Sequence, residues 1–452
     1  MLRNLLCAMA LAMAMAPAQA QDAEVMKMRE ELRQLQQRMQ VLERKLDENA
    51  AQAAQAAQAS NRPSAPNALN PGISAILNGV YANLSRDPER YRIGGFVPSM
   101  GDVSPGKRGL SLGESELGLS ANVDHLFRGS LVAAISPEDN GVEIEEGYIQ
   151  STGLSQGFTL KAGRFFSSVG YQNEIHAHAW DFVDAPLVMK AFLGGQLADD
   201  GIQLRWVAPT ELYFDAGLEL GRGRAFPAGP EGGRNKNGFG SGNLFAHLGG
   251  DLNESTAWQA GVSYLATSPR NRGFEDVDST GAAVTDGFSG TSRLWALGGV
   301  LKWSPQGNAT ERNLKLQGEY FRRREHGTLT YDVAAQSLGT MDGSYASTQS
   351  GWYVQGAYQF MPHWRAGYRY DRLDSGTTRL GLVDSGALGA ADFPILAAYN
   401  PRRQSAMVDW SPSEFSRLRL QFARDYSRPG KPDDELFLQY IVSLGAHGAH
   451  TF

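Results

Sequence analysis

His176 and His178, two histidines one residue apart, are the residues of this chain whose type and spacing best suit metal binding. On an extended segment, side chains at positions i and i+2 lie on the same side, and imidazole suits zinc, copper and nickel. Three carboxylates nearby in the sequence could complete such a site: Glu174, Asp181 and Asp184. Histidine pairs are also common on exposed loops, so a zinc site and an ordinary loop both stay open. His447 and His450 form a second pair near the end of the chain.

Nine basic side chains recur at alternate positions of neighbouring segments, which would place them on one face of a sheet. They are Lys161, Arg205, Lys315, Arg323, Arg365, Arg369, Arg403, Arg417 and Arg419. Rows of arginine and lysine along a pore favour anions and phosphates, because a guanidinium binds their oxygens in a bidentate manner. The alternative is that carboxylates neutralise the row and leave a transverse field; the candidates are Glu143, Glu145, Glu319, Asp371 and Asp409.

No catalytic signature stands out in the sequence. A zinc-protease helix motif is absent, and the glycines of 221–224 lack the strand-loop-helix context of a phosphate-binding loop. The net charge of −6 in 452 residues gives no basis for nucleic-acid binding. We therefore expect neither an enzyme nor a nucleic-acid partner, although small serine and histidine sites on outer-membrane enzymes would escape such a search.

Turn lengths along the chain indicate the element that positions these residues. Amphipathic segments are joined alternately by short turns, at 123–126, 209–210, 251–254, 361–362 and 412–413, and by long connections, at 167–198, 223–241, 268–291, 325–349 and 375–401. This alternation is typical of outer-membrane β-barrels. It predicts an all-β fold, a transmembrane antiparallel barrel of about 16 strands. The expected strands are 91–97, 110–122, 127–136, 142–151, 156–166, 199–208, 211–222, 242–251, 255–267, 292–304, 313–324, 350–361, 363–374, 402–411, 415–425 and 435–452.

The period of two assigns faces to several of these strands. In 313–324, Leu314, Leu316 and Tyr320 share one side, whereas Lys315 and Arg323 share the other. The same division holds in 363–374 and 415–425. The apolar side should face lipid, because a basic side chain there costs about 2–4 kcal/mol at the bilayer midplane. The charged side should face water inside the barrel.

The region before the barrel divides into three parts. Residues 1–20 have the basic, apolar and small-residue regions of a secretory signal, which contains the only cysteine, Cys7. Residues 21–49 carry apolar positions spaced alternately by three and four, which predicts a short α-helical coiled coil. Residues 50–90 form a linker, in which 73–81 could be a short helix. The barrel would then comprise 91–452.

The connection 167–198 is the third on the outer side of the barrel if both chain ends are periplasmic, counted from the first hairpin loop at 98–109. In porins with a similar number of strands, this loop folds inward and narrows the pore. Here it carries aromatic and charged side chains suited to a constriction: Tyr171, Glu174, Trp180, Asp181 and Asp184. The alternative is an ordinary exposed loop.

Signal, coiled coil, linker and barrel in this order resemble trimeric outer-membrane porins with an N-terminal coiled coil, such as DcaP-like porins and the phosphate-selective porin O/P group. The terminal Phe452 is similar to the aromatic residue through which the barrel-assembly machinery recognises outer-membrane proteins. The last strand, 436–452, also resembles proteins labelled zinc-regulated TonB-dependent outer-membrane receptors, but 21–90 is too short for the plug domain of such a receptor.

The sequence therefore predicts a homotrimeric porin of a Gram-negative outer membrane, which contacts lipid and passes small solutes that could be anionic. The coiled coil would lie in the periplasm, and no resident cofactor is expected unless zinc binds His176 and His178. A metal-linked uptake protein is the alternative from another class. A structural barrel and an outer-membrane enzyme are further alternatives.

Overall fold

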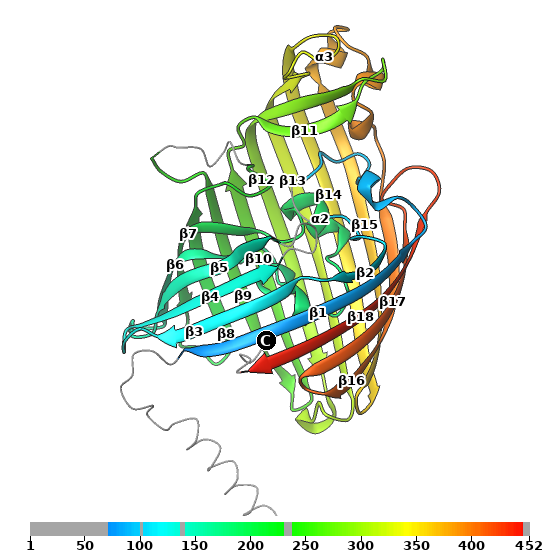
Figure 1. The fold of residues 1–452 in the computed structure, drawn as a ribbon. Helices are drawn as coiled ribbons and strands as arrows, with labels where there is room; N and C mark the ends of the chain where they lie inside the picture. Colours follow the sequence, from blue (N-terminus) through cyan, green and yellow to red (C-terminus); the bar gives the residue numbers. More distant parts are fainter. Residues whose placement is uncertain (1–70, 100–102, 136–140, 230–236, 446–452) are drawn as a thin grey trace, which may run out of the picture. The chain divides into compact units, whose positions relative to one another are not determined.

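Eighteen strands form one antiparallel sheet that closes on itself as a barrel in the computed structural model of the protein (Figure 1). Strand β1 closes the barrel by pairing with β18 on one side and with β2 and β3 on the other. Two of the strands that cross the wall are each broken into two pieces. Strands β2 and β3 both pair with β1 and together form one crossing, and β10 and β11 both pair with β12 and form another. Sixteen segments therefore span the wall, as the sequence predicted.

The strands are β1 (Gly72–Leu84), β2 (Gly109–Leu112), β3 (Ser115–Asn122), β4 (Phe127–Ile135), β5 (Val142–Ser151), β6 (Phe158–Phe166), β7 (Ala198–Val207), β8 (Tyr213–Gly221), β9 (Ser241–Asn253), β10 (Thr256–Thr267), β11 (Arg272–Val277), β12 (Ala283–Trp303), β13 (Asn313–Tyr331), β14 (Met341–Met361), β15 (Trp364–Leu380), β16 (Arg402–Ser413), β17 (Ser416–Asp425) and β18 (Asp433–Gly445). Two short α-helices lie in the connections, α2 (Leu187–Leu193) and α3 (Gly381–Asp384).

The structure describes residues 71–99, 103–135, 141–229 and 237–445. The expected signal, the coiled coil, the linker up to residue 70, the histidines at 447 and 450 and the terminal Phe452 lie outside this part of the chain. Within it, no helix is both long enough and apolar enough to cross a membrane.

The first strand corrects two expectations. Residues 73–81, where a short helix was expected, belong to β1, and 91–97 form no strand. Ile73, Leu77 and Tyr81 point outward from β1, whereas Ile76 and Ala82 point inward. The spacing of these residues fits a helix and a strand alike. Closure of the sheet decides between them, because an unclosed edge would leave backbone N–H and C=O groups without partners.

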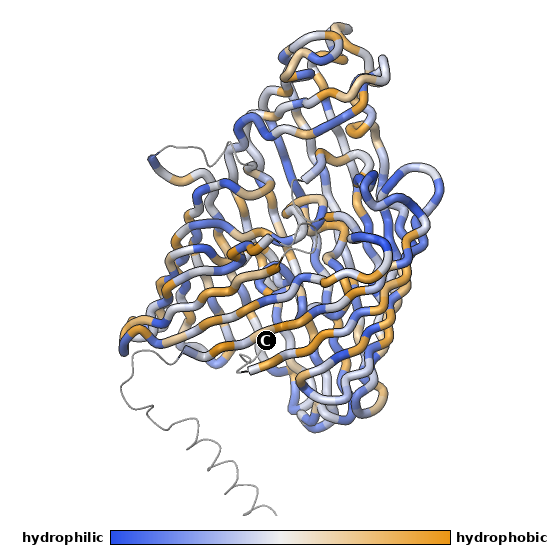
Figure 2. Tube along the Cα trace, in the orientation of Figure 1, coloured by the Kyte–Doolittle hydropathy of each residue, from blue (hydrophilic) through white to orange (hydrophobic). Residues whose placement is uncertain are grey.

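Exposure along the strands confirms the faces that the sequence predicted. On β13, Leu316 and Tyr320 are exposed, whereas Gln317, Glu319 and Arg323 are buried. The same alternation holds on β15 and β17. Figure 2 shows apolar and polar residues alternating along the strands. The inner face of the barrel is thus rich in polar and charged side chains.

The wall is much taller on the side of β12–β15 (Figure 1). Strands β12 and β14 have 21 residues each, whereas β3 has 8 and β4 has 9. Much of the expected loops 268–291 and 325–349, and the start of 375–401, is therefore strand. Inward-facing aromatic residues on these extensions, Phe288, Tyr331 and Tyr345, pack with Phe393 in a separate apolar cluster. Burial of this cluster stabilises the protruding sheet.

Both ends of the sheet lie on the side of the short turns, which follows from the antiparallel order that starts with β1 and ends with β18. Strands β1, β4 and β6 end on the opposite side, so the connection after β6, residues 167–197, is the third on that side. The connection 167–197 thus lies on the side expected from the sequence.

Asp332 organises the turn between β13 and β14. Its carboxylate accepts from the backbone N–H groups of Gln336 (2.6 Å), Ser337 (2.8 Å) and Gly339 (3.3 Å). Burial acts to raise the pKa of Asp332, but these hydrogen bonds outweigh burial and lower it below its ordinary value. The carboxylate therefore stabilises the turn above the unfolded pKa of about 3.9, and the contribution is lost as the pH falls through the folded pKa.

We expect Asp332→Ala to increase proteolytic cleavage within 332–340 severalfold at pH 7, and this effect should shrink progressively as the pH falls below the unfolded pKa of about 3.9. Limited proteolysis of the refolded protein with an acid-tolerant protease measures this difference. Asp342→Ala is the matched control, since the exposed Asp342 accepts from a single side chain, Thr330 Oγ1 (2.6 Å). Equal cleavage of both variants at pH 7 would contradict the assigned role.

Candidate functional site

The connection between β6 and β7, residues 167–197, lies inside the barrel and packs against the taller wall. Helix α2 forms its centre, and all seven residues of the helix are buried. Its apolar side chains share a cluster with inward-facing residues of β12–β15, namely Leu294, Ala296, Phe321, Tyr353 and Leu373. Gly194 ends the helix in the left-handed conformation (φ 72°), which glycine adopts without strain. Apolar burial therefore seats the segment against one half of the wall.

Hydrogen bonds hold the two ends of this segment. The side-chain amide of Asn173 donates to the carbonyls of Ser167 (2.7 Å) and Leu197 (2.9 Å) and accepts from the Leu197 N–H (2.7 Å). The Glu319 carboxylate on β13 accepts from the Tyr171 N–H (2.6 Å). These contacts fix the backbone where the segment leaves and re-enters the wall.

Asp184 is the central charged contact between the segment and the wall. Its carboxylate lies 2.9 Å from Lys190 Nζ and 3.1 Å from Arg369 Nη2, and it also pairs with Arg403. Burial acts to raise the pKa of Asp184, but Arg403, Lys190 and Arg369 outweigh burial and hold it well below its ordinary value. Arg369 also pairs with Asp371 at 2.9 Å. One carboxylate of the segment thus contacts three cations, and carboxylates of the wall share in balancing their charge.

Asp181 forms a second anchor of the same kind. Its carboxylate lies 3.0 Å from Lys315 Nζ and 3.1 Å from Arg365 Nη1. Arg365 and Arg419 share the carboxylate of Asp409, at 2.5 and 2.7 Å. Segment and wall are therefore joined by two groups of ion pairs, one around Asp184 and one around Asp181. Removal of either carboxylate would leave an excess of buried positive charge in its group.

All nine basic side chains that the sequence grouped together lie on the inner face of the barrel. Besides the pairs above, Arg205 binds Glu174 (2.7 Å), Arg323 binds Gln349 (2.7 Å), Arg403 binds Glu435, Arg417 donates to the His178 carbonyl, and Lys161 lies over the rings of Tyr148 and Phe165. Asp371 and Asp409 neutralise part of the row, in line with the alternative interpretation. Glu319 instead binds backbone amides, and Glu145 faces a histidine.

The aromatic residues expected at a constriction occupy different positions. Tyr171 lies beneath Lys315, with the ammonium 5.5 Å from the ring centroid, and lines a cavity. Trp180 is only 7% exposed and donates from Nε1 to the Ile175 carbonyl (2.7 Å). Tyr171 therefore borders an open space, whereas Trp180 packs within the segment.

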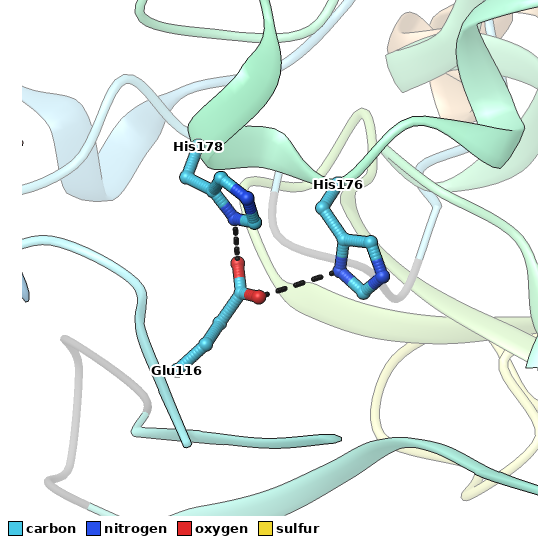
Figure 3. Close-up of side chains that lie close together, drawn as sticks. All are labelled: Glu116, His176 and His178. Atoms are coloured by element: carbon cyan, nitrogen blue, oxygen red, sulfur yellow. Dashed lines mark hydrogen bonds and ion pairs between the residues drawn. The ribbon is translucent and has the colours of Figure 1, made fainter. Parts of the chain in front are cut away.

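His176 and His178 meet three glutamates from the wall, of which Figure 3 shows Glu116. Glu116 of β3 lies between the two rings, 2.6 Å from His178 Nδ1 and 3.4 Å from His176 Nδ1. Glu145 and Glu146 of β5 lie 3.6 Å from His176 Nδ1 and 3.1 Å from His176 Nε2. Burial acts to lower the pKa of His176, but the glutamates outweigh burial and raise it well above its ordinary value.

A β-bulge places two consecutive glutamates on the same histidine. Val132 of β4 pairs with Glu146, the next residue Ala133 pairs with Ile144, and Glu145 has no partner across this pair of strands. In a regular strand Glu145 and Glu146 would point to opposite faces, but a bulge re-aims one of them. The consecutive glutamates in an otherwise alternating strand are the only sequence signal of this irregularity.

None of the three carboxylates expected to complete the histidine site does so. Glu174 pairs with Arg205, and Asp181 and Asp184 pair with the basic wall. The partners of the histidines are instead Glu116, 62 residues from His178, and Glu146, 30 residues from His176. The prediction that nearby residues in the sequence would complete the site was therefore wrong, because the carboxylates come from β3 and β5, which lie next to the segment in space.

Cavities lie on both sides of the segment. Toward the short turns, cavities of about 440 Å³ and 710 Å³ are lined by Tyr171, Glu174, Arg205, Lys302, Lys315 and Arg365, among others. Toward the long connections, a cavity of about 570 Å³ lies between the segment and β1, β5, β6 and β18. Charges of both signs line it: Glu114, Glu143 and Glu145, and Lys107, Arg164 and Arg224. The segment thus divides a polar interior into two chambers.

Comparison with known proteins gives one clear relative. No family model matches the chain. An uncharacterized protein of Aquifex aeolicus (strain VF5) is 31% identical over 371 residues, which cover 76% of this chain and 71% of that protein.

Several solved barrels overlap most of the chain at low identity. One is a loop L8 deletion mutant of OmpT, an outer membrane protein of Vibrio cholerae. It is 10% identical with a TM-score of 0.49, over 83% of this chain and 99% of the OmpT chain. The outer membrane channel DcaP of Acinetobacter baumannii is 13% identical with a TM-score of 0.45, over 83% of this chain and 97% of DcaP. An anion-selective porin from Comamonas acidovorans is 10% identical with a TM-score of 0.43, over 83% of this chain and 99% of the porin.

Proposed function

The chain belongs to the same family as the uncharacterized Aquifex aeolicus protein, and we propose that it is an outer-membrane channel of the porin type. It passes small hydrophilic solutes by diffusion through the polar interior of the barrel. The observation that carries this proposal is the charged segment 167–197, which crosses the interior and leaves chambers on both of its sides.

A belt of exposed apolar side chains supports placement in a membrane. Each of the sixteen spanning segments carries at least one large apolar residue that is more than a third exposed. One from each segment is Leu77, Leu117, Leu131, Ile149, Leu160, Leu204, Leu218, Leu244, Val262, Leu297, Leu316, Val354, Tyr368, Val408, Leu420 and Leu438. Such a continuous surface is costly in water but matches hydrocarbon.

Arginines border this belt on the side of the long connections. Arg293, Arg322 and Arg424 are exposed, and each lies two residues beyond an exposed aromatic side chain of the belt, Trp295, Tyr320 or Phe422. Guanidinium groups at this height suit the phosphates of lipid headgroups. The belt and its basic border therefore agree with the proposed contact with outer-membrane lipid.

The pairing of the basic wall argues for weak charge selectivity. A ladder of unpaired arginines would favour anions strongly. Here Asp181, Asp184 and Asp409 compensate most of the wall cations, and the chamber toward the long connections carries both signs. We therefore propose a modest preference for anions within a transverse field, rather than a phosphate-specific pathway.

Planar-bilayer recording of the refolded protein tests the channel. We expect steady conductance steps and, in a tenfold salt gradient, a reversal potential of anion sign well below the ~59 mV of a fully selective channel. Cross-linking of the same preparation, with and without residues 24–49, tests the proposed trimer and its coiled coil. If trimers persist without these residues, the barrel rather than the coiled coil makes the contacts between subunits.

Absence of conductance in a preparation that is folded, as judged by heat-modifiable migration on gels, would overturn the channel and favour a structural barrel. An outer-membrane enzyme receives no support from the two Gly-x-Ser-x-Gly patterns of the chain. Residues 109–113 comprise β2 and the residue after it, and 153–157 form the turn before β6. Neither pattern is followed by a helix, as a nucleophile elbow requires.

A further inference from the structure

We propose that Glu116, His176 and His178, with Glu145 as a fourth ligand, form a binding site for a divalent transition-metal ion such as Zn²⁺. Donor atoms of Glu116, His176 and His178 all lie within 4.8 Å of one another, so one ion could reach all three. Glu114, Glu116 and Glu145 form an overlapping group of the same dimensions. The site lies inside the barrel where the segment 167–197 meets β3 and β5.

The distances fit tetrahedral coordination with small adjustments. Zinc bonds of about 2.0–2.2 Å to nitrogen and oxygen place tetrahedral ligand atoms roughly 3.3 Å apart. His176 Nδ1 lies 3.4 Å from Glu116 Oε2 and 3.6 Å from Glu145 Oε2, close to this separation. His178 Nδ1 hydrogen-bonds Glu116 at 2.6 Å, and an ion inserted between them would replace that bond.

Two of these donor atoms lack a hydrogen bond although they are buried. His176 Nδ1 and Glu145 Oε2 have no hydrogen-bond partner among the described residues, and they face each other. Buried polar atoms are normally hydrogen-bonded, and these two approach each other only as an ion pair at 3.6 Å, a separation at which one ion could bind both. The bulge that re-aims Glu145 is the feature that brings this second atom to the site.

The outer contacts of the cluster are those of a metal site. A histidine that binds metal through one ring nitrogen usually donates from the other to a carboxylate, which fixes its tautomer. His176 Nε2 lies 3.1 Å from Glu146 Oε2, and Glu146 is held in turn by the Phe166 N–H (3.3 Å). The Phe166 ring packs edge-on against His176, with centroids 5.1 Å apart. The imidazole is thus oriented by its surroundings.

Ligand type and charge select the class of ion. Two imidazoles disfavour Ca²⁺ and Mg²⁺, which prefer oxygen ligands only, and suit Zn²⁺ and its neighbours. Two carboxylates, Glu116 and Glu145, would balance the charge of a divalent ion. Bound there, the ion would tie the backbone at 176–178 to two strands and restrain the segment that divides the interior.

Metal binding to the refolded, untagged full chain tests the site without any channel activity, so its outcome is separable from that of the proposed function. The background is His447→Ala/His450→Ala, which removes the other histidine pair. Titration calorimetry with Zn²⁺ at pH 7.5 is expected to show one ion per chain. Co²⁺ should give the visible absorption of a tetrahedral complex.

Matched variants locate the ion. Glu116→Gln and His178→Ala should abolish stoichiometric binding, and Glu146→Gln, which alters only an outer contact, should weaken it about 10–100-fold. His247→Ala and Glu174→Ala are controls, because His247 pairs with Asp215 and Glu174 with Arg205. No binding in the background protein, or unchanged binding in Glu116→Gln with heat-modifiable migration preserved, would overturn the proposal.

Discussion

Replacement of Asp184 by alanine is expected to release the interior segment and to change the pore more than any other single substitution in it. The variant leaves Lys190, Arg369 and Arg403 without the carboxylate they share. Removing one partner of a buried ion-pair network costs about 3–5 kcal/mol. Since about 1.4 kcal/mol is a factor of ten, the seated conformation would lose two to four orders of magnitude in population.

Single-channel recording should show the consequence directly. Conductance is expected to rise and to fluctuate, and the reversal potential should shift toward anions because the interior loses one negative charge. Asp184→Asn separates charge from shape and should reproduce the shift in selectivity. Asp374→Ala is the matched control, since Asp374 is exposed and accepts from the Gly376 N–H. Unchanged conductance and selectivity in Asp184→Ala would show that the segment does not control passage.

Glu325→Ala is expected to destabilise the barrel strongly without altering selectivity. Glu325 binds Arg272 in a bidentate manner, at 2.8 and 2.9 Å, and lies 3.8 Å from Arg323. All three side chains are fully buried. Loss of the carboxylate leaves two guanidinium groups uncompensated, at a cost of about 3–5 kcal/mol. The denaturation midpoint of the folded protein in urea should fall accordingly.

A triple variant provides the control for this effect. Arg272→Met/Arg323→Met/Glu325→Leu removes the charges together, and replacement of a whole buried triad by apolar residues is often neutral or stabilising. Stability of the triple variant near that of the native protein would attribute the loss in Glu325→Ala to the uncompensated charge. Native stability of Glu325→Ala itself would contradict the argument.

Alternation along the sequence determined most of the barrel. A strand in a barrel wall has lipid on one side and water on the other, so its residues must alternate, and the faces of β13, β15 and β17 could be predicted from that rule. Turn lengths gave the polarity of the strands and hence the side on which 167–197 lies. The nine basic residues that the sequence grouped together share the inner face of the structure, because parity depends only on local spacing.

Pairing across the barrel was decided by the tertiary structure alone. The spacing of Ile73, Ile76 and Leu77 suits a helix and a strand equally, and only closure of the sheet between β18 and β2 makes it a strand. The heights of β12–β15 depend on aromatic residues that bury one another from separate strands, which no single strand can signal.

The charged interior shows the same division. The sequence identified His176, His178, Asp181 and Asp184 as residues of interest, because their types and position are local properties. It assigned the wrong carboxylates to the histidines, since Glu116, Glu145 and Glu146 reach them only through strand pairing and a bulge. Sequence periodicity determines which way a side chain points; the closed barrel determines which side chain it meets, because contacts across the interior join residues far apart in the chain.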